Sequence, residues 1–246
     1  MGYHESLTEG RNAVLEAFRS GKTVDRLFVL DGCQDGLVKT ILREAKKQDT
    51  MVQYVKKERL DQLSETKNHQ GVIAYCAACE YAEVSDILEN AKKKGEAPFI
   101  VLLDGIEDPH NLGAIIRTAN QAGAHGVIIP KRRAVGLTAT VARTSAGAVN
   151  YTPVAKVTNL VTVMEDLKKE GMWFVCADMD GEEMYSLNLK GPIGLVIGNE
   201  GEGVSRLVKE HCDMVASIPM KGDIDSLNAS VAMGVLAYEI VRQRRF

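Results

Sequence analysis

The sequence predicts an α/β protein in two parts, a small α/β domain over residues 1–78 and a larger parallel-sheet domain over residues 98–246. Three observations support this. Short apolar segments alternate with amphipathic helical segments, which is the pattern of βα units. The apolar segments of the second part are continuous runs, as expected for parallel strands buried on both faces. A charged stretch with Lys92-Lys93-Lys94-Gly95 interrupts the pattern, so residues 79–97 are expected to link the domains, with a helix at Val84 to Ala91.

The first part begins with an expected helix from Leu7 to Arg19, because Val14, Leu15 and Phe18 have helical spacing and Thr8 or Asn12 can cap it. The elements expected next are a strand at Arg26 to Leu30, a helix at Leu37 to Lys47, a strand at Met51 to Val55, a helix at Lys57 to Leu63 and a strand at Val72 to Cys76. His69 lies in a polar loop and is expected to be a solvated residue.

The second part repeats the strand and helix alternation more regularly. Strands are expected at Phe99 to Leu103, Gly126 to Ile129, around Val154, and at Met172 to Ala177, Ile193 to Ile197 and Met214 to Ile218. Helices are expected at Asn111 to Ala122, Thr138 to Ala146, Leu160 to Lys169, Val204 to His211 and Asn228 to Arg242. This order predicts a mostly parallel sheet covered on both faces.

Composition excludes several classes of protein. The net charge is -3, so any contact with RNA must come from local basic patches. Aromatic residues make up 5%, which argues against a surface that stacks many bases. Five cysteines at irregular spacing, with a lone Cys76-Ala-Ala-Cys79, predict reduced structural thiols and no metal site. No apolar run approaches about 18 residues, and a cytoplasmic protein is expected.

Three polar loops follow strands of the second part. They are Asp104 to Gly113, Gly198 to Gly203 and Ser217 to Ala232. Loops at the carboxyl ends of parallel strands share one edge of the sheet, so the three should converge there. By itself, the third stretch is equally well read as a turn followed by a helix capped by Asp225, Ser226 or Asn228. If it is a cap, Asp225 is the preferred residue, which leaves Ser226 and Asn228 for chemistry.

Familiar nucleotide-binding and hydrolase motifs fail here. Gly198-Asn199-Glu200-Gly201-Glu202-Gly203 lacks the spacing of GxGxxG, and Gly21-Lys22-Thr23 lacks the first glycine of a P-loop because Glu16 occupies it. The three loops instead offer backbone groups, amide side chains and one arginine, Arg117. Those groups suit an adenosine-like ligand lying against backbone, together with an anionic or hydroxylated second substrate. Arg117 is six residues from Asn111, so it is also consistent with a salt-bridge residue on the helix surface.

Together the three loops resemble the motifs of the SpoU (TrmH-like) RNA ribose 2′-O-methyltransferases of the SPOUT superfamily. The matching stretches are Asp108 to Ala119, Ile197 to Gly203 and Ile218 to Ala232, and the similarity covers about residues 99–242. Residues 1–78 resemble the L30e-like RNA substrate-binding domain of this family, above all of its RlmB-type 23S rRNA enzymes. Gly10-Arg11-Asn12-Ala13-Val14 and His69-Gln70-Gly71-Val72 carry that likeness.

The resemblance implies a sheet with a C-terminal trefoil knot, a homodimer, and S-adenosylmethionine held near Gly198, Ile218 and Leu227. Glycine at 198 would let the backbone approach the cofactor. It also implies that the catalytic polar residues are Asn111, Arg117, Glu200, Ser226 and Asn228. The family's proposed base corresponds to Arg117, although arginine normally stays protonated, and binding the adjacent phosphate fits its chemistry at least as well. Glu200 is expected to support the cofactor loop.

RNA contacts are expected from Arg11 and from the basic loop Lys131-Arg132-Arg133. The basic C-terminus with Arg242, Arg244 and Arg245 is a further candidate, and each basic run is otherwise a solvated surface. The implied reaction is methyl transfer from S-adenosylmethionine to the ribose 2′-hydroxyl of a guanosine in 23S rRNA. A tRNA ribose is the alternative substrate, and a non-catalytic RNA-binding ribosome-assembly factor is the alternative of another class.

Overall fold

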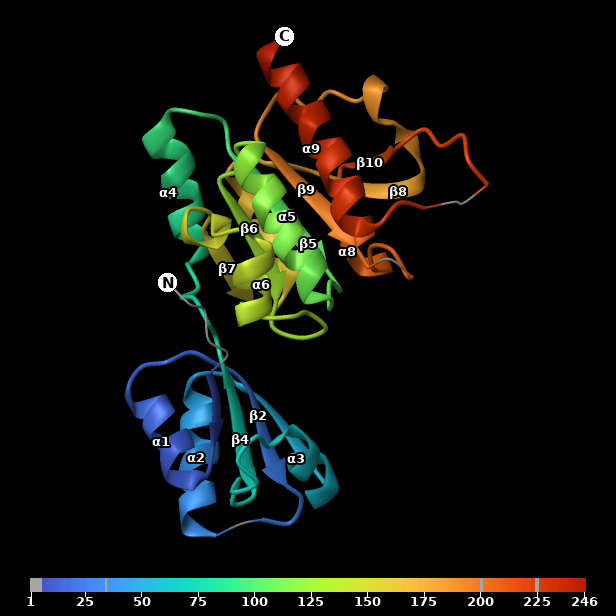
Figure 1. Ribbon diagram of the computed structural model, residues 1–246. Coiled ribbons are helices and arrows are strands. Elements are labelled where there is room, and N and C mark those ends of the chain that lie inside the picture. Colours follow the sequence, from blue (N-terminus) through green and yellow to red (C-terminus); the bar gives the residue numbers. More distant parts are fainter. Residues whose placement is uncertain (1–5, 34, 200, 224–225) are drawn as a thin grey trace. The chain divides into compact units, whose positions relative to one another are not determined.

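A computed structural model of the chain describes residues 6–33, 35–199, 201–223 and 226–246 (Figure 1). The chain forms two compact units. The first extends to Glu80 and includes residues 136–139, and the second comprises Tyr81–Val135 and Thr140–Phe246.

The first unit is a four-stranded sheet in the order β1-β4-β2-β3, with helices on both faces. Its elements are β1 (Ser6–Glu9), α1 (Arg11–Arg19), β2 (Val24–Leu30), α2 (Gly36–Lys47), β3 (Met51–Val55), α3 (Lys57–Leu63) and β4 (Val72–Cys76). Only β2 and β3 are parallel, and β4 runs antiparallel to both β1 and β2. Buried residues of α1 and α2 pack on one face, and Leu60 of α3 packs on Phe28 and Ile73 of the other.

The expected helix from Leu7 to Arg19 is wrong in its first part. Residues 6–9 form β1, in which Leu7 pairs with Tyr75 and Glu9 with Ile73. Helix α1 begins only after Gly10, whose φ of 88° lies outside helical backbone, and neither Thr8 nor Asn12 caps it. Leu7 is seven residues before Val14, so its position also fits a helical stripe, and periodicity alone could not separate the two elements.

The polar loops of this unit are tied down by buried side chains. His69 is 6% exposed and is not the solvated residue that was expected. Its Nδ1 accepts the backbone N–H of Gly71 at 3.0 Å, so the neutral ring has its proton on Nε2, which donates to Asp61 Oδ1 at 3.0 Å. The imidazole therefore fixes the turn that precedes β4.

Glu9 holds a second loop through a cluster of hydrogen bonds. Its carboxylate accepts the N–H groups of Glu65 at 2.7 Å and Thr66 at 3.2 Å, and also the hydroxyls of Ser64 and Thr66. Burial raises the pKa of Glu9, but the four hydrogen bonds lower it by more, so the net pKa lies below its ordinary value. The ionised carboxylate therefore stabilises the folded unit.

Replacing Glu9 by Gln should destabilise the first unit at neutral pH by about 1 kcal/mol, because the amide brings an N–H group toward existing donors. The folded pKa lies below the unfolded pKa of about 4.3. The stabilisation is thus complete above that unfolded value and is lost as pH falls through the lower folded pKa. Calorimetric melting should show the difference between variant and wild type shrinking in acid. Glu16→Gln, at an exposed position of α1, is the control. An equal effect of both substitutions would contradict the prediction.

The second unit is built on a six-stranded parallel sheet in the order β10-β8-β9-β5-β6-β7. Its strands are β5 (Phe99–Asp104), β6 (Gly126–Pro130), β7 (Val154–Val157), β8 (Trp173–Glu183), β9 (Ile193–Gly198) and β10 (Met214–Ser217). All residues of β5 from Phe99 to Leu103 are buried, as a strand covered on both faces requires. The predicted parallel α/β architecture of this part is confirmed.

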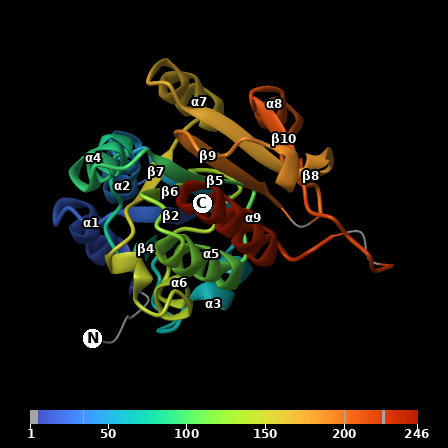
Figure 2. The same ribbon diagram turned by 90° about the horizontal axis from the view of Figure 1, so that it is seen from above.

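Helices cover both faces of that sheet, as Figure 2 shows from above. Helices α4 (Val84–Lys94), α7 (Leu160–Lys169) and α8 (Arg206–Glu210) pack on the face that carries Ile100 and Phe174. Helices α5 (Pro109–Gln121) and α9 (Ala229–Arg245) pack against each other and on strands β6 and β9. The short helices α6 (Ala139–Thr144), η1 (Ala148–Asn150) and η2 (Met184–Ser186) complete the unit.

Helix α4 lies within residues 79–97, where a linker with a helix at Val84 to Ala91 was expected, and it continues to Lys94. Its Ile87 is 0% exposed and belongs to the same buried cluster as Ile100 and Phe174. A Cβ at Gly126 would lie 2.5 Å from the Ile87 side chain, so the helix sits tightly against the start of β6. Most of this stretch is therefore a packed element of the second unit.

The described residues contain no helix long and apolar enough to cross a membrane. Among the same residues, no three His, Cys, Asp or Glu side chains gather closely enough to hold a metal ion. Whether the chain forms the trefoil knot stays a prediction from the resemblance.

Candidate functional site

The three polar loops leave the same edge of the sheet in the second unit. Strands β5 and β9 are adjacent and parallel, with Asp104 paired to Gly198 at their carboxyl ends. Strand β10 lies on the same side, separated from β9 by β8. Because all these strands are parallel, the segments that follow β5, β9 and β10 begin at one edge.

The first two loops are fastened to each other by two side chains. Asn199 Nδ2 donates to the carbonyl oxygen of Gly105 at 3.0 Å. The Asp104 carboxylate accepts the backbone N–H of Ser205 at 2.8 Å. The Asn199 Oδ1 atom accepts the N–H of Gly201 at 2.8 Å, which fixes the amide so that its NH₂ group points at Gly105. One asparagine thus shapes its own loop and binds the neighbouring one.

Gly198 permits a close approach of two backbone segments. A Cβ there would lie 2.0 Å from the carbonyl carbon of Gly203 and 2.1 Å from the nitrogen of Val204. Asn199 and Gly203 exchange two backbone hydrogen bonds, at 2.9 and 3.1 Å, which close the loop over Gly198. The glycine is therefore required by the loop itself, whereas the sequence-based interpretation gave its clearance to a ligand.

The first and third loops meet through two asparagines. Asn228 Nδ2 donates to Asn111 Oδ1 at 2.9 Å, and Asn111 is 8% exposed. Asn228 is also the N-cap of α9, because its Oδ1 accepts the backbone N–H of Ser230 at 3.0 Å. Asp225 was the preferred cap, with Asn228 left for chemistry, and this needs correction. Asn228 both caps the helix and donates a hydrogen bond to Asn111. Asp225 itself lies outside the described residues.

The other predicted site residues are not joined to the Asn111–Asn228 pair by any hydrogen bond between described residues. Arg117 is on α5 and is exposed, and within the described part of the chain its side chain makes no hydrogen bond or ion pair. Ser226 is exposed, and Ile218 and Leu227 are half-buried in the segment after β10. Glu200 lies outside the described residues. The structure thus brings Asn111 and Asn228 together and does not join Arg117 to them within one chain.

A fourth segment at this edge was missed by sequence reasoning. Strand β8 pairs with β9 only up to Cys176, and its pairing with β10 jumps from Cys176–Val215 to Glu182–Ala216. Residues 177–181 therefore bulge out of the sheet between the ends of β9 and β10. The sequence signal was Gly181, where a Cβ would lie 2.5 Å from the carbonyl oxygen of Val215. A glycine inside a strand pattern often indicates a bulge.

The bulge is anchored to α8 by an ion pair. Asp178 contacts Lys209 Nζ at 2.7 Å, and both side chains are mostly buried. Burial raises the pKa of Asp178, but the hydrogen bonds from Lys209 and from the backbone N–H of Asp180 lower it by more, so the net shift is downward. The hydrogen bond to Asp178 raises the pKa of Lys209. Both groups are therefore charged at neutral pH, and they hold the bulge in place.

Helix α5 enters the site against α6. A Cβ at Gly113 would lie 1.8 Å from Thr144 Oγ1 and 3.0 Å from the backbone nitrogen of Ser145. Asp108 caps α5 by accepting the N–H of His110 at 2.8 Å, with Pro109 in the first turn. The close helix packing and the cap together fix the position of Asn111 in the first turn.

The predicted RNA-binding residues differ in their exposure and in the contacts that they make within the chain. Arg11 in the first unit pairs with Asp35 at 2.8 Å and donates from Nε to the carbonyl of Gln70 at 2.9 Å, so it organises two loops. Arg132 and Arg133 are exposed in the loop after β6, where Lys131 is half-buried. Arg244 is not a solvated residue, because its guanidinium donates to the carbonyls of Ala97, Pro98 and Gly191 at 2.7–2.9 Å.

The edge of the sheet where the loops converge offers backbone groups and apolar side chains that suit an adenosine-like ligand. It presents backbone from three loops and the bulge, with Met179 at 63% and Met220 at 41% exposure as apolar contacts. Exposed backbone and apolar side chains suit a purine and a methionine chain.

Comparison with known proteins shows which families the two parts of the chain match. Residues 98–238 match the model of the SpoU rRNA methylase family, and residues 7–82 match that of the RNA 2′-O ribose methyltransferase substrate-binding domain. The chain is 49% identical over 237 residues, covering 96% of this chain and 94% of its relative, to YacO of Bacillus subtilis, whose name places it among TrmH family tRNA/rRNA methyltransferases.

Two solved structures are similar over nearly the whole chain. The SpoU methyltransferase AviRb of Streptomyces viridochromogenes, in complex with the cofactor AdoMet, has a TM-score of 0.62 at 27% identity and covers 98% of this chain and 91% of its own. An AdoMet-bound rRNA methyltransferase of Sinorhizobium meliloti has a TM-score of 0.61 at 25% identity, with 97% and 87% covered.

Proposed function

The chain belongs to the SpoU family of RNA 2′-O-ribose methyltransferases, and we propose that it methylates the ribose 2′-oxygen of a guanosine in 23S rRNA. The observation that carries this proposal is the hydrogen bond between Asn228 and Asn111 at 2.9 Å. It joins two segments 117 residues apart at the edge of the sheet where the family motifs converge.

The proposed cofactor is S-adenosylmethionine, which AviRb and the Sinorhizobium enzyme bind. When bound, it supplies an activated methyl group. The residues proposed to hold it are Gly198, Ile218 and Leu227, and we add the bulge at residues 177–181. Asn199 and the Asp178–Lys209 pair would keep these segments in position before the cofactor arrives.

The chain's own side chains would align the ribose and remove its proton. Asn111 and Asn228 orient each other, and Ser226 is exposed two residues before Asn228. Arg117 is proposed to bind the phosphate next to the target ribose, because a guanidinium binds phosphate in a bidentate manner and rarely gives up its proton. Glu200 is proposed to support the cofactor loop.

Substituting Asn228 by Ser should separate its two roles. Serine is also a good N-cap, so α9 should lose only a few tenths of a kcal/mol, but the donor to Asn111 disappears. We expect methyl transfer to fall about tenfold or more as the alignment loosens, while the melting temperature stays near that of wild type. Asn228→Ala is the comparison, since it loses the cap as well and should cost about 1 kcal/mol more. Normal transfer by Asn228→Ser would show that the Asn111 contact is not needed.

Residues 1–78 are proposed as the RNA substrate-binding domain and 98–246 as the methyltransferase domain, with helix α4 of the predicted linker 79–97 packed on the second unit. The match of residues 7–82 to the substrate-binding family model supports the first assignment. Arg11, Lys131, Arg132 and Arg133 are proposed to contact RNA. Arg132 and Arg133 are exposed, whereas Arg11 would act mainly by keeping its loops in shape.

The deciding experiment offers the protein labelled S-adenosylmethionine with 23S rRNA and, separately, with total tRNA. Ribose label in 23S rRNA is the expected result. Label confined to tRNA would favour the alternative substrate, which the name of the Bacillus relative also allows. An assembly factor without catalysis would label neither, and calorimetry with the cofactor would then show no binding. Label on base atoms would overturn the proposed reaction.

We also propose that the protein is a cytoplasmic homodimer. Arg117 is exposed and has no partner within the described part of its own chain, so a second subunit can approach it. Helix α9 exposes Val231 and Tyr238, at 50% and 52%, and their seven-residue spacing puts them on one face of the helix. Light scattering should give twice the monomer mass, and Tyr238→Glu should shift it toward the monomer.

A further inference from the structure

The end of helix α9 carries a half-buried cation, Arg244, with no ion-paired carboxylate among the described residues. Arg244 donates to three carbonyl oxygens and lies 5.5 Å from the centre of the Phe99 ring. Among the described residues no carboxylate lies within ion-pair distance of it, and its buried Nε has no hydrogen-bond partner. Burial lowers the pKa of Arg244, as expected for a guanidinium removed from water.

Two adjoining hollows open beside this arginine. One, of about 750 Å³, is lined by Glu96, Phe99, Lys190, Arg244 and Arg245 among others. The other, of about 340 Å³, is lined by Tyr185, Asn188, Arg242 and further residues. They share Lys190, Gln243 and Phe246, so they adjoin each other, and we call the two together the α9-end groove.

The floor of the α9-end groove is held rigidly. Gln243 is 8% exposed, and its Oε1 accepts the N–H of Leu189 at 2.9 Å while its Nε2 donates to the carbonyl of Leu187 at 3.0 Å. The residues on either side of this contact, Tyr185 and Lys190, are therefore fixed relative to α9. The groove is thus a built feature of the unit.

The charge and aromatic character of the groove indicate its ligand. Arg242 is neutralised by Glu239 at 2.7 Å, which leaves Lys190, Arg244 and Arg245 against one acidic side chain, Glu96, among the described lining residues. Tyr185 and Phe246 are exposed at 59% and 90%. Cations along a groove with exposed rings are the features that bind single-stranded nucleic acid, in which phosphates meet cations and bases stack on rings. Two rings suffice for a short segment, although 5% aromatic residues argue against a large stacking surface.

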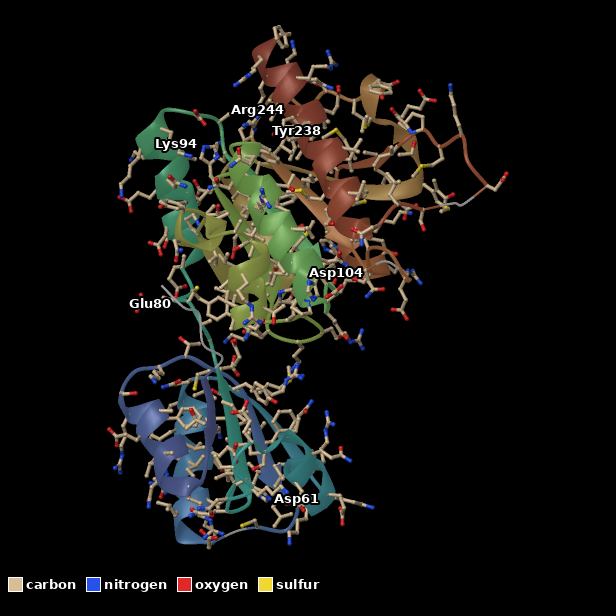
Figure 3. The ribbon with its side chains drawn as sticks, in the orientation of Figure 1. Asp61, Glu80, Lys94, Asp104, Tyr238 and Arg244 are labelled. Carbon is tan, nitrogen blue, oxygen red and sulfur yellow. The ribbon has the colours of Figure 1, made fainter. Side chains whose placement is uncertain are left out.

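We propose that the α9-end groove binds an unpaired segment of the RNA substrate at a distance from the methylation site. Helix α9 has 17 residues and is therefore about 25 Å long. Asn228 caps its first turn, and Arg244 lies at its other end, away from Asp104 (Figure 3). The groove is thus a second RNA contact point, about one helix length away from the methylation site. This inference rests on the proposed function, since it takes RNA as the substrate.

Two substitutions test the groove in the full-length protein. Tyr185→Ala should weaken binding of a short unstructured oligoribonucleotide about tenfold, as loss of one stacked base would. Lys190→Glu should weaken it too and reduce the salt dependence by about one phosphate contact. The controls are Tyr151→Ala and Lys169→Glu, which change an exposed ring and an exposed lysine outside the groove. Both controls should bind as wild type does.

The same variants, assayed with the proposed rRNA substrate, should raise KM and leave kcat at saturating RNA unchanged. The groove proposal alone would be overturned if the wild type transfers the methyl group but the groove variants match their controls in RNA affinity, salt dependence and KM for RNA. Absence of transfer by wild type would overturn the proposed function instead. If inorganic phosphate binds the groove but the variants bind RNA as tightly as the wild type does, that result would also count against an RNA ligand.

Discussion

Gly198→Ala is expected to cause the largest loss among substitutions at the loop edge. The new methyl group would lie 2.0 Å from the Gly203 carbonyl carbon and 2.2 Å from its oxygen. Backbone atoms cannot move aside as a flexible side chain can, so the loop of residues 199–203 must shift. We expect a loss of about 1–3 kcal/mol from overpacking, with cofactor affinity lowered by about tenfold or more because the Asn199–Gly105 hydrogen bond shifts with the loop.

Gly201→Ala is the matched control in the same loop. Among the described residues, a Cβ there would meet only Asn199 Oδ1, at 3.4 Å, which is an ordinary contact. Thermal melting and calorimetry with S-adenosylmethionine would measure both variants. If the two glycines tolerate alanine equally well, the closed conformation of the loop is not what the protein uses to bind the cofactor.

Arg117→Ala should abolish methyl transfer while leaving the fold and the cofactor affinity near normal. The side chain is exposed and makes no hydrogen bond or ion pair with the described residues, so its removal should disturb the fold little. A residue that aligns or deprotonates the ribose contributes about 10²–10⁴-fold to the rate. Single-turnover assays and calorimetry with the cofactor separate these effects. A large loss of cofactor affinity would mean that Arg117 belongs to the cofactor site.

Two further variants define the role of Arg117. Arg117→Lys retains the charge without the bidentate fork, so partial activity is expected if the residue binds phosphate. Arg206→Ala is the control, since Arg206 is 90% exposed on α8 and pairs only with Glu210 among the described residues. It should leave the transfer rate unchanged.

Sequence patterns located most elements because the apolar runs are long and the glycines and prolines that end them are local signals. Strands β3 and β4 and helix α3 lie where they were predicted. Patterns failed where two periods coincide, as at Leu7, whose spacing fits both β1 and α1. They also failed at β8, where the shift at Ala216 depends on which strand lies beside it.

The site shows the same division. The convergence of the loops follows from parallel strands, but the Asn111–Asn228 contact joins residues whose distance no local pattern encodes. The contacts of Arg244 were missed for the same reason, since its guanidinium binds backbone carbonyls of segments that periodicity cannot place beside it. The clearance at Gly198 was predicted, but its occupant is the loop's own backbone.

The asparagine contacts have a consequence for kinetic experiments. The Asn199–Gly105 and Asn228–Asn111 hydrogen bonds contain only carboxamide and peptide groups, which neither gain nor lose protons over the range in which enzymes are assayed. The alignment they provide should therefore be constant across that range. A pH–rate profile of single turnovers would then report the ionisation of the group that accepts the ribose proton, with little contribution from rearrangement of these two contacts.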